Sequence, residues 1–277
     1  MSYLLRLCKY FVITPLTRLL YLLSIKSNRK NFTYFFNFRS FLNNCKERIY
    51  FKDNCYFFNN KDWKFSEQQQ GLTAYGAGFE DRINDLKSSY LIQNLEFNDG
   101  DVIIDIGANN GDFYLCFNKK IEYYGIEPSP SIFQSLEYNI KNQNLINKGV
   151  WNTSNKEIEF FVKDASGDSS IIPINGFTKK IKIETITLDE VLNKINKPIK
   201  LIKLEAEGAE PEILDGLKIN LNNIKYISVD CGFERGVKKT STIAECSNFL
   251  INNNFEMINF TNGRVIALYK NKNFSQN

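Results

Sequence analysis

Residues 99–113, DGDVIIDIGANNGDF, decide the fold of this chain. A turn is followed by a short, unbroken apolar run at residues 102–106, and then by the glycines Gly107 and Gly111. Unbroken apolar runs of this length are typical of strands that are buried on both faces of a parallel sheet. The segment therefore predicts a buried strand that ends in a glycine-rich loop and leads into a helix.

The glycine loop favours a nucleoside site over a dinucleotide or phosphate site. It lacks the third glycine of the G-x-G-x-x-G fingerprint and the Lys-Ser/Thr pair of a P-loop. Close backbone approach beside Asp105 suits a ligand whose amino-acid end meets an acid and backbone amides. A second strand, residues 123–127, ends in Glu127, which is placed to accept both hydroxyls of a ribose. A tight strand–helix turn without a ligand is the alternative interpretation of the glycines.

A third strand is predicted near residues 145–151, after a helix over residues 131–142 that Ser131 caps. Its carboxyl end is expected beside the adenine of the ligand. A place for Trp151 in the protein core remains the alternative for that side chain. The predicted cofactor-binding residues are Asp105, Gly107, Asn109, Gly111, Glu127, Gly149, Val150 and Trp151.

A fourth strand with its loop, residues 199–210, and a fifth strand ending in Asp230 carry the remaining acids. Alternation places Lys203 and Glu205 on one face of the fourth strand, with Glu207 in the loop beyond. Ligands of open α/β sheets bind at the carboxyl ends of the strands. Because the chain has no histidine, we predict Glu207 or Asp230 as the catalytic proton acceptor. Lys203 or Glu205 is predicted to orient it.

The end of the chain predicts an antiparallel hairpin of residues 255–260 and 264–270, with Asn262-Gly263 as its turn. Before it, Arg235 is expected to contact an anionic acceptor. Glu210 is expected either at the site or as a capping residue of the next helix.

Two further β-like runs, residues 157–163 and 179–186, precede the fourth strand. The link between them, residues 164–177, is rich in small residues and is interpreted either as a flap over the acceptor or as a plain hairpin. Thr187 and Glu190 form the pattern of a capping box, which predicts a helix start.

Five segments, in this order, resemble the FkbM family of methyltransferases: DIGANNGDF, GIEPSP, NKGVWN, TLDEVL and KLEAEGAEPEILDGL. The resemblance covers about residues 102–260 and leaves residues 1–90 uncovered. It implies a class I methyltransferase (Rossmann-like) fold, which is a doubly wound, mostly parallel α/β sheet with a C-terminal antiparallel hairpin. Glu205 stands where family members often carry Asp, so the charge is kept and the reach is longer.

The resemblance also implies S-adenosyl-L-methionine as the methyl donor and O-methylation of a hydroxyl group. Acceptors in the family include sugars and polyketides, and a sugar, glycan or related small molecule is the acceptor expected here. A divalent cation such as Mg²⁺, bridging the acids and the acceptor hydroxyls, is a further hypothesis, since hard oxygen ligands suit it.

Two alternatives to a methyltransferase are a non-catalytic nucleoside-binding or scaffolding protein and a nicotinamide-dependent oxidoreductase, which the missing third glycine disfavours. The absence of histidine also excludes a Ser-His-Asp triad and a His-ligated metal. The six cysteines form no C-x-x-C pair, which indicates reduced thiols in a cytoplasmic protein.

Positive charge is concentrated at the N-terminus. Residues 1–46 contain eight Lys and Arg and no Asp or Glu, whereas the rest of the chain has 27 basic and 31 acidic residues. A nucleic-acid site should spread its positive charge over the folded domain, so no nucleic-acid partner is expected.

Residues 1–25 are strongly apolar, but charged residues and Pro15 interrupt them, so they are too short to span a bilayer. Two interpretations remain open: contact of residues 1–30 with the inner face of a membrane, or packing on the catalytic domain or a partner subunit. The predicted division is an amphipathic, aromatic-rich extension at residues 1–90, a methyltransferase domain at residues 91–270, and a tail at residues 271–277. The oligomeric state is not indicated.

Overall fold

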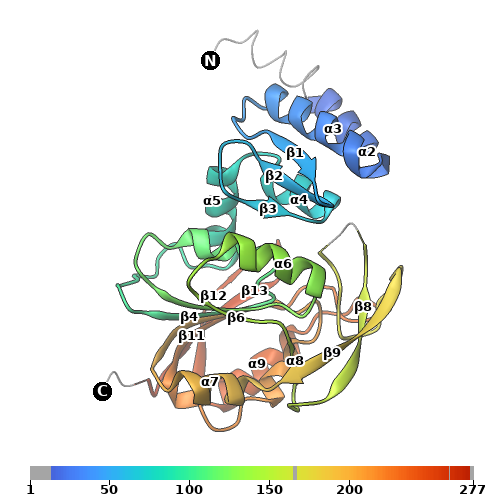
Figure 1. Cartoon of the computed structure of the whole chain (residues 1–277). Helices are drawn as coiled ribbons and strands as arrows, with labels where there is room; N and C mark the ends of the chain where they lie inside the picture. The colour runs from blue at the N-terminus through green and yellow to red at the C-terminus, as the bar shows by residue number, and fades with distance from the viewer. Residues whose placement is uncertain (1–13, 165–166, 262, 275–277) are drawn as a thin grey trace. The chain divides into compact units, whose positions relative to one another are not determined.

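The computed structural model describes residues 14–164, 167–261 and 263–274. The chain divides into two compact units, which Figure 1 draws together. Of the described residues, unit 1 holds 14–82 and 167, and unit 2 holds 83–164, 168–261 and 263–274. The boundary falls inside helix α5 (Phe79–Ser89).

Unit 1 is built around aromatic side chains. Helices α2 and α3 pack on each other beside a three-stranded antiparallel sheet in the order β1-β2-β3. The elements are α2 (Thr14–Lys26), α3 (Arg29–Leu42), β1 (Ile49–Lys52), β2 (Cys55–Phe58), β3 (Lys64–Phe65) and α4 (Gln68–Tyr75). Ring contacts within this unit join Phe32, Phe36, Tyr56, Phe58, Phe65 and Tyr75, all of them buried. Large rings therefore supply the apolar surface that such a small unit needs.

The N-terminal segment is more regular than its aromatic composition indicated. Helix α4 ends at Tyr75, and Gly71 lies within that helix. A Cβ atom at Gly71 would lie 1.9 Å from the ring of Phe65, so glycine is required there for packing. Residues 1–13, part of the segment 1–30 for which membrane contact or packing was left open, lie outside the described residues.

Unit 2 contains a seven-stranded sheet in the order β12-β13-β11-β10-β4-β5-β6. The five strands from β11 to β6 are parallel, and β13 runs antiparallel to both β11 and β12. The strands are β4 (Val102–Ile106), β5 (Glu122–Ile126), β6 (Asn144–Ile146), β10 (Ile199–Leu204), β11 (Ile224–Asp230), β12 (Phe255–Thr261) and β13 (Ile266–Asn271). This arrangement confirms the doubly wound sheet and its C-terminal antiparallel hairpin.

Helices cover both faces of this sheet (Figure 1). One apolar core joins alternate residues of β4, β10 and β11, such as Ile104, Ile202 and Ile227, to side chains of α7, α8 and α9. The helices and 3₁₀ helices of unit 2 are η2 (Asp112–Cys116), α6 (Pro130–Asn139), α7 (Leu188–Ile195), α8 (Glu210–Asp215), η3 (Leu221–Asn223) and α9 (Ile243–Asn252). Every residue of β4 is buried, as the unbroken apolar run predicted.

The third predicted strand is divided between two sheets. β6 joins the main sheet, whereas β7 (Gly149–Val150) pairs with β9 (Lys179–Ile186), which also pairs with β8 (Glu157–Val162). A Cβ atom at Gly149 would lie 2.7 Å from Ile183, so glycine lets the two strands approach. The two β-like runs thus form an antiparallel pair. Residues 165–166 of their link lie outside the described residues.

Three local predictions need correction. Helix α6 begins at Pro130, which suits the first helical position, so Ser129 precedes the helix and Ser131 is not its cap. The helix expected after the glycine loop is only the short 3₁₀ helix η2. Thr261 pairs with Ile266, so four residues, not two, connect β12 and β13, and Asn262 among them lies outside the described residues. The Thr187 cap of α7 is confirmed, because its hydroxyl accepts from the Glu190 amide at 3.2 Å.

Candidate functional site

The strand order of the main sheet reverses between β4 and β10, which are hydrogen-bonded neighbours. In open α/β sheets such a reversal opens a ligand crevice at the carboxyl ends of the strands. The five acids of the prediction all occur at this edge, within or just after β4, β5, β10 and β11: Asp105, Glu127, Glu205, Glu207 and Asp230.

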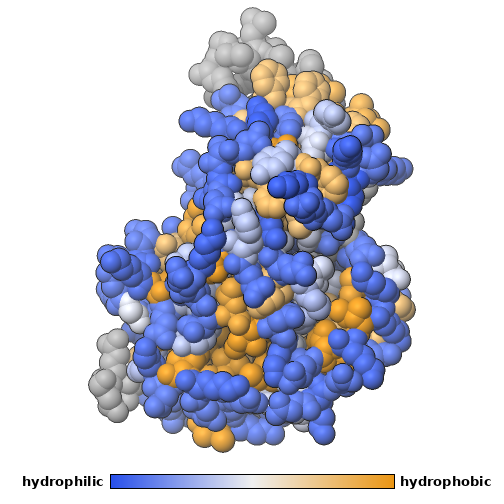
Figure 2. All heavy atoms as spheres, in the orientation of Figure 1, coloured by the Kyte–Doolittle hydropathy of each residue, from blue (hydrophilic) through white to orange (hydrophobic). Residues whose placement is uncertain are grey.

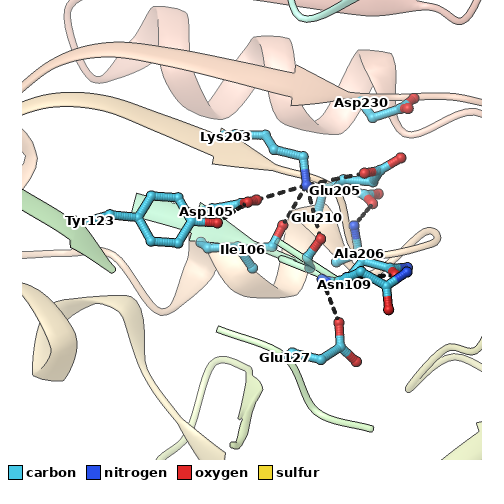
Figure 3. Close-up of polar contacts among 12 residues, drawn as sticks. Asp105, Ile106, Asn109, Tyr123, Glu127, Lys203, Glu205, Ala206, Glu210 and Asp230 are labelled. Atoms are coloured by element: carbon cyan, nitrogen blue, oxygen red, sulfur yellow. Dashed lines mark hydrogen bonds and ion pairs between the residues drawn. The ribbon is translucent and has the colours of Figure 1, made fainter. Parts of the chain in front are cut away.

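Lys203 is the central cation of this edge (Figure 3). It stands opposite Asp105 in the β10–β4 register, and only 3% of its surface is exposed. Its Nζ donates to Asp105 Oδ1 at 2.8 Å and to the Gly107 carbonyl at 2.9 Å, and lies 3.1 Å from Glu205 Oε2. One ammonium group therefore ties the glycine loop to the loop after β10.

Asp105 is fully buried, and both of its oxygens are engaged. The Tyr123 hydroxyl donates to Oδ2 at 2.5 Å, while Lys203 binds Oδ1. Burial raises the pKa of Asp105, and the lysine and the tyrosine oppose that rise. Burial alone would lower the pKa of Lys203, but Asp105 and Glu205 raise it above its usual value. The charged pair is thus mutually stabilised across the reversal point.

Glu127 is held by backbone amides at the end of β5. Its Oε1 accepts from the Ser129 N–H at 2.9 Å, and its Oε2 accepts from the Asn109 N–H at 3.0 Å. Burial raises the pKa of Glu127 to about 7, against the effect of these two amides. Each carboxylate oxygen can accept a second hydrogen bond. The clamp therefore fixes a carboxylate beside the glycine loop with acceptor capacity left for a diol.

The glycines of the loop are required by packing. Gly107 has φ +71°, and a Cβ atom there would lie 2.0 Å from the Glu205 carbonyl oxygen. Gly111 has φ +90°, and its Cβ atom would lie 2.5 Å from Ile140. Asn109 between them is also left-handed, with φ +53°. The loop thus turns sharply and packs closely against the loop after β10.

The three predicted adenine-wall residues occupy β7 and the position after it. Gly149 and Val150 are buried, and Val150 belongs to the main apolar core. Trp151 is partly buried, packs against the same core, and donates its backbone N–H to the Ile186 carbonyl at 2.9 Å. The side chain of Trp151 thus packs against the protein core, which was the alternative interpretation for this residue.

Arg264, which the sequence analysis missed, neutralises two of the predicted acids. Its Nη2 lies 2.5 Å from both Glu205 Oε1 and Asp230 Oδ2. Burial and Glu205 raise the pKa of Asp230 to about 6, and Arg264 opposes this rise. Burial would also raise the pKa of Glu205, but Lys203 and Arg264 bring it below its usual value. Asp230 and Glu205 are thus bound in ion pairs.

Glu207 differs from its neighbours. Within the part of the chain that the structure describes, its carboxylate makes no hydrogen bond or ion pair, although its backbone carbonyl accepts from Ser170 Oγ at 2.9 Å. Its φ of +51° is an uncommon conformation for a glutamate. Burial, and then Glu234, raise the pKa of Glu207 well above its usual value. Burial and nearby acids likewise raise the pKa of Glu234, a residue the sequence analysis did not single out, to about 8.

Glu210 and Arg235 have structural partners. Glu210 Oε1 accepts from the amides of Ala206 at 2.9 Å and Gly208 at 3.1 Å, so this acid shapes the loop that carries Glu207. Arg235 pairs with both oxygens of Glu212, so the guanidinium expected to meet an anionic acceptor already has a carboxylate partner. Among residues 14–164, 167–261 and 263–274 no group of three or more Cys, Asp or Glu could hold a metal ion, so the Mg²⁺ hypothesis gains no support.

A family model described as the methyltransferase FkbM domain matches residues 105–257. The hexuronic acid methyltransferase AglP of Haloferax volcanii is 27% identical over 159 residues, which are 54% of this chain and 64% of AglP. The chain thus spans less than two thirds of that relative. The 2-O-methyltransferase NoeI of Sinorhizobium fredii is 24% identical over 182 residues, 57% of this chain and 74% of NoeI. Aeropyrum pernix fibrillarin, solved with S-adenosyl-L-methionine, has a TM-score of 0.40 and 11% identity, with 80% of this chain and 96% of fibrillarin covered.

Proposed function

The chain belongs to the methyltransferase FkbM family, and we propose that it transfers the methyl group of S-adenosyl-L-methionine to a hydroxyl group of a sugar or glycan. The observation that carries this proposal is the Glu127 carboxylate, clamped by two amides beside the glycine loop at the reversal of strand order. The names of AglP and NoeI, a hexuronic acid methyltransferase and a 2-O-methyltransferase, support the choice of acceptor.

The residues at this edge suit the donor. S-adenosyl-L-methionine is a sulfonium cation with a ribose and an amino-acid end, and when bound it supplies an electrophilic methyl group. Glu127 accepts the ribose hydroxyls, and carboxylates near the sulfur favour a cation. The backbone of the loop receives the amino-acid end, while Asp105 positions that loop through Lys203. The residues proposed to form the donor site, by contact or by positioning the loop and walls, are Asp105, Gly107, Asn109, Gly111, Glu127, Gly149, Val150 and Trp151.

Glu207 is the proton acceptor that the geometry favours. A hydroxyl group must lose its proton as it becomes an ether, and a positioned carboxylate can take it. Arg264 holds Asp230, and Lys203 and Arg264 hold Glu205, so these acids serve to orient the site. The raised pKa of Glu207 gives it a high affinity for a proton. A cation bound nearby lowers that pKa and leaves the carboxylate ionised for the reaction.

Calorimetric titration with S-adenosylhomocysteine tests the donor site, with NAD as the control ligand. We expect the protein to bind S-adenosylhomocysteine but not NAD. A Glu127→Ala variant that folds normally should lose most of the affinity for S-adenosylhomocysteine. Failure of the intact, folded protein to bind would refute the proposal and favour a scaffolding role.

Transfer of an isotope-labelled methyl group to a panel of neutral sugars, hexuronic acids and glycans tests the reaction. Glu207→Gln should lower kcat by about 10²–10⁴-fold, the usual contribution of general base catalysis, without a comparable change in S-adenosylhomocysteine affinity. The matched variant Asp230→Asn should lower kcat less than Glu207→Gln does. If Asp230→Asn alone shows the large loss, the proton acceptor is Asp230.

A further inference from the structure

Helices α2 and α3 of unit 1 carry large apolar side chains on their outer surface. In Figure 2 orange side chains gather over these two helices. Six large side chains of α2 and α3 are between 45% and 73% exposed, namely Leu19, Leu22, Leu23, Tyr34, Phe38 and Phe41. Solitary exposed apolar residues are ordinary on protein surfaces, but six on two helices that pack on each other indicate an interaction surface.

The exposed residues form one stripe on each helix. On α2, Leu22 and Leu23 follow Leu19 by three and four residues, the spacing of one helical face. The buried residues Leu20 and Ser24 of the same helix lie on another face. Each helix therefore has an inner face within unit 1 and a second apolar face outside it.

The stripe on α3 follows the same rule. Tyr34, Phe38 and Phe41 are separated by four and three residues, while Phe32 and Phe36 are fully buried in the aromatic core. A surface helix normally places polar residues opposite its core-facing side. On α3 three large rings take that place.

Lysines continue both stripes. Lys26 follows Leu22 and Leu23 by four and three residues, and Lys30 precedes Tyr34 by four, so each ammonium lies on the face of its helix's apolar stripe. Both lysines are exposed. No Asp or Glu occurs between residues 14 and 46, so no carboxylate of these helices neutralises them.

We propose that this face of α2 and α3, defined by the six exposed apolar side chains with Lys26 and Lys30, docks unit 1 on an anionic membrane surface. Apolar side chains enter the boundary between headgroups and acyl chains, while long lysine side chains reach anionic headgroups. No helix in the described part of the chain is long and apolar enough to cross a membrane. The same face of a second copy would add two more lysines and no carboxylate from α2 or α3 to neutralise them. The proposal does not depend on the methyltransferase activity.

Co-sedimentation of the full chain with vesicles tests the proposal. We expect binding to vesicles of phosphatidylglycerol and phosphatidylcholine, weaker binding to phosphatidylcholine alone, and loss of binding at high salt. Each lysine near an anionic surface contributes about fivefold to affinity, so Lys26→Gln with Lys30→Gln should weaken binding about 30-fold. The control pair Lys270→Gln with Lys272→Gln makes the same change of charge in unit 2 and should have little effect.

A second variant tests the apolar side chains. Leu22→Ser with Phe38→Ser should abolish vesicle binding, whereas Ile219→Ser, at an exposed apolar position of unit 2, should not. Thermal unfolding of each variant shows that the fold is kept. Absence of vesicle binding by the unchanged protein would overturn the proposal, and so would a concentration-dependent dimer that Leu22→Ser with Phe38→Ser dissociates while vesicle binding persists.

Discussion

Replacement of Lys203 by methionine would show how much one buried ammonium contributes to the site. The side chains of Lys203 and Asp105 are 4% and 0% exposed, and their charged atoms lie 2.8 Å apart. Removal of one partner from such a buried pair leaves an uncompensated charge and costs about 3–5 kcal/mol. We therefore expect Lys203→Met to lower the free energy of unfolding by about 3–5 kcal/mol at pH 7.

The size of this loss should depend on pH. Burial already raises the pKa of Asp105, and loss of Lys203 removes the main opposing charge. An acid whose pKa is higher in the folded than in the unfolded state destabilises the fold as pH rises from its unfolded pKa, about 4, towards its folded pKa. The difference between Lys203→Met and the unchanged protein should accordingly be larger at pH 7 than at pH 5.

Urea denaturation followed by circular dichroism measures these differences. Lys197→Met is the matched control, since Lys197 pairs with Glu122 at 2.6 Å on the surface, where such a pair contributes about 1 kcal/mol or less. The double variant Lys203→Met, Asp105→Asn should lose less than the two single losses added together. Equal effects of Lys203→Met and Lys197→Met, or strict additivity in the double variant, would refute the argument.

Three further outcomes follow from the site. The affinity for S-adenosylhomocysteine should fall about tenfold from pH 8 to pH 6, as protonation of Glu127 at a pKa of about 7 removes an acceptor, and a pH-independent affinity would contradict the assigned role. Gly107→Ala should lower the free energy of unfolding, measured by urea denaturation, by about 2–5 kcal/mol. The control Gly176→Ala should lower it by only about 1–2 kcal/mol, because Gly176 has φ +73° but no atom within 4 Å of its Cβ position. Equal losses would show that the close approach of Gly107 to Glu205 does not matter. Arg264→Gln should raise the pKa of Asp230 further, because a neighbouring cation is lost. NMR titration of the carboxyl groups measures this pKa, and an unchanged value would contradict the expectation.

The sequence predicted the parallel strands in their succession along the chain and the edge of the sheet at which the acids meet. The unbroken apolar run ending at Asp105 and the alternation through Lys203 were enough, because parallel strands share one carboxyl edge. It did not predict that these two side chains pair, since that depends on the register between β4 and β10. Residues 98 positions apart in the chain give no local signal of such a contact.

Arg264 was missed for a related reason. It lies in the connection of the hairpin, and only the pairing of β13 with β11, where Ile266 stands opposite Asp230, brings it to the acids. The antiparallel hairpin was predicted, so the residues just before its second strand could have been placed at the carboxyl edge of the sheet. In unit 1, strand β2 alternates between buried and partly exposed side chains, but both kinds of position carry aromatic residues, such as Phe57 and Phe58. The sequence therefore showed no apolar–polar alternation that would indicate a strand.

The clamp on Glu127 uses peptide N–H groups, so the side chains at its two donors are not what holds the acid. At position 129 the clamp itself requires only that the backbone keeps its course, although Ser129 is 3% exposed, so that only small side chains fit there. Position 109 tolerates fewer residue types, because its φ of +53° admits Asn, Asp or Gly far more readily than a β-branched residue. A natural variant with valine at position 109 would thus disturb the carboxylate at position 127 without touching it, and a sequence search guided by acids alone would overlook that change.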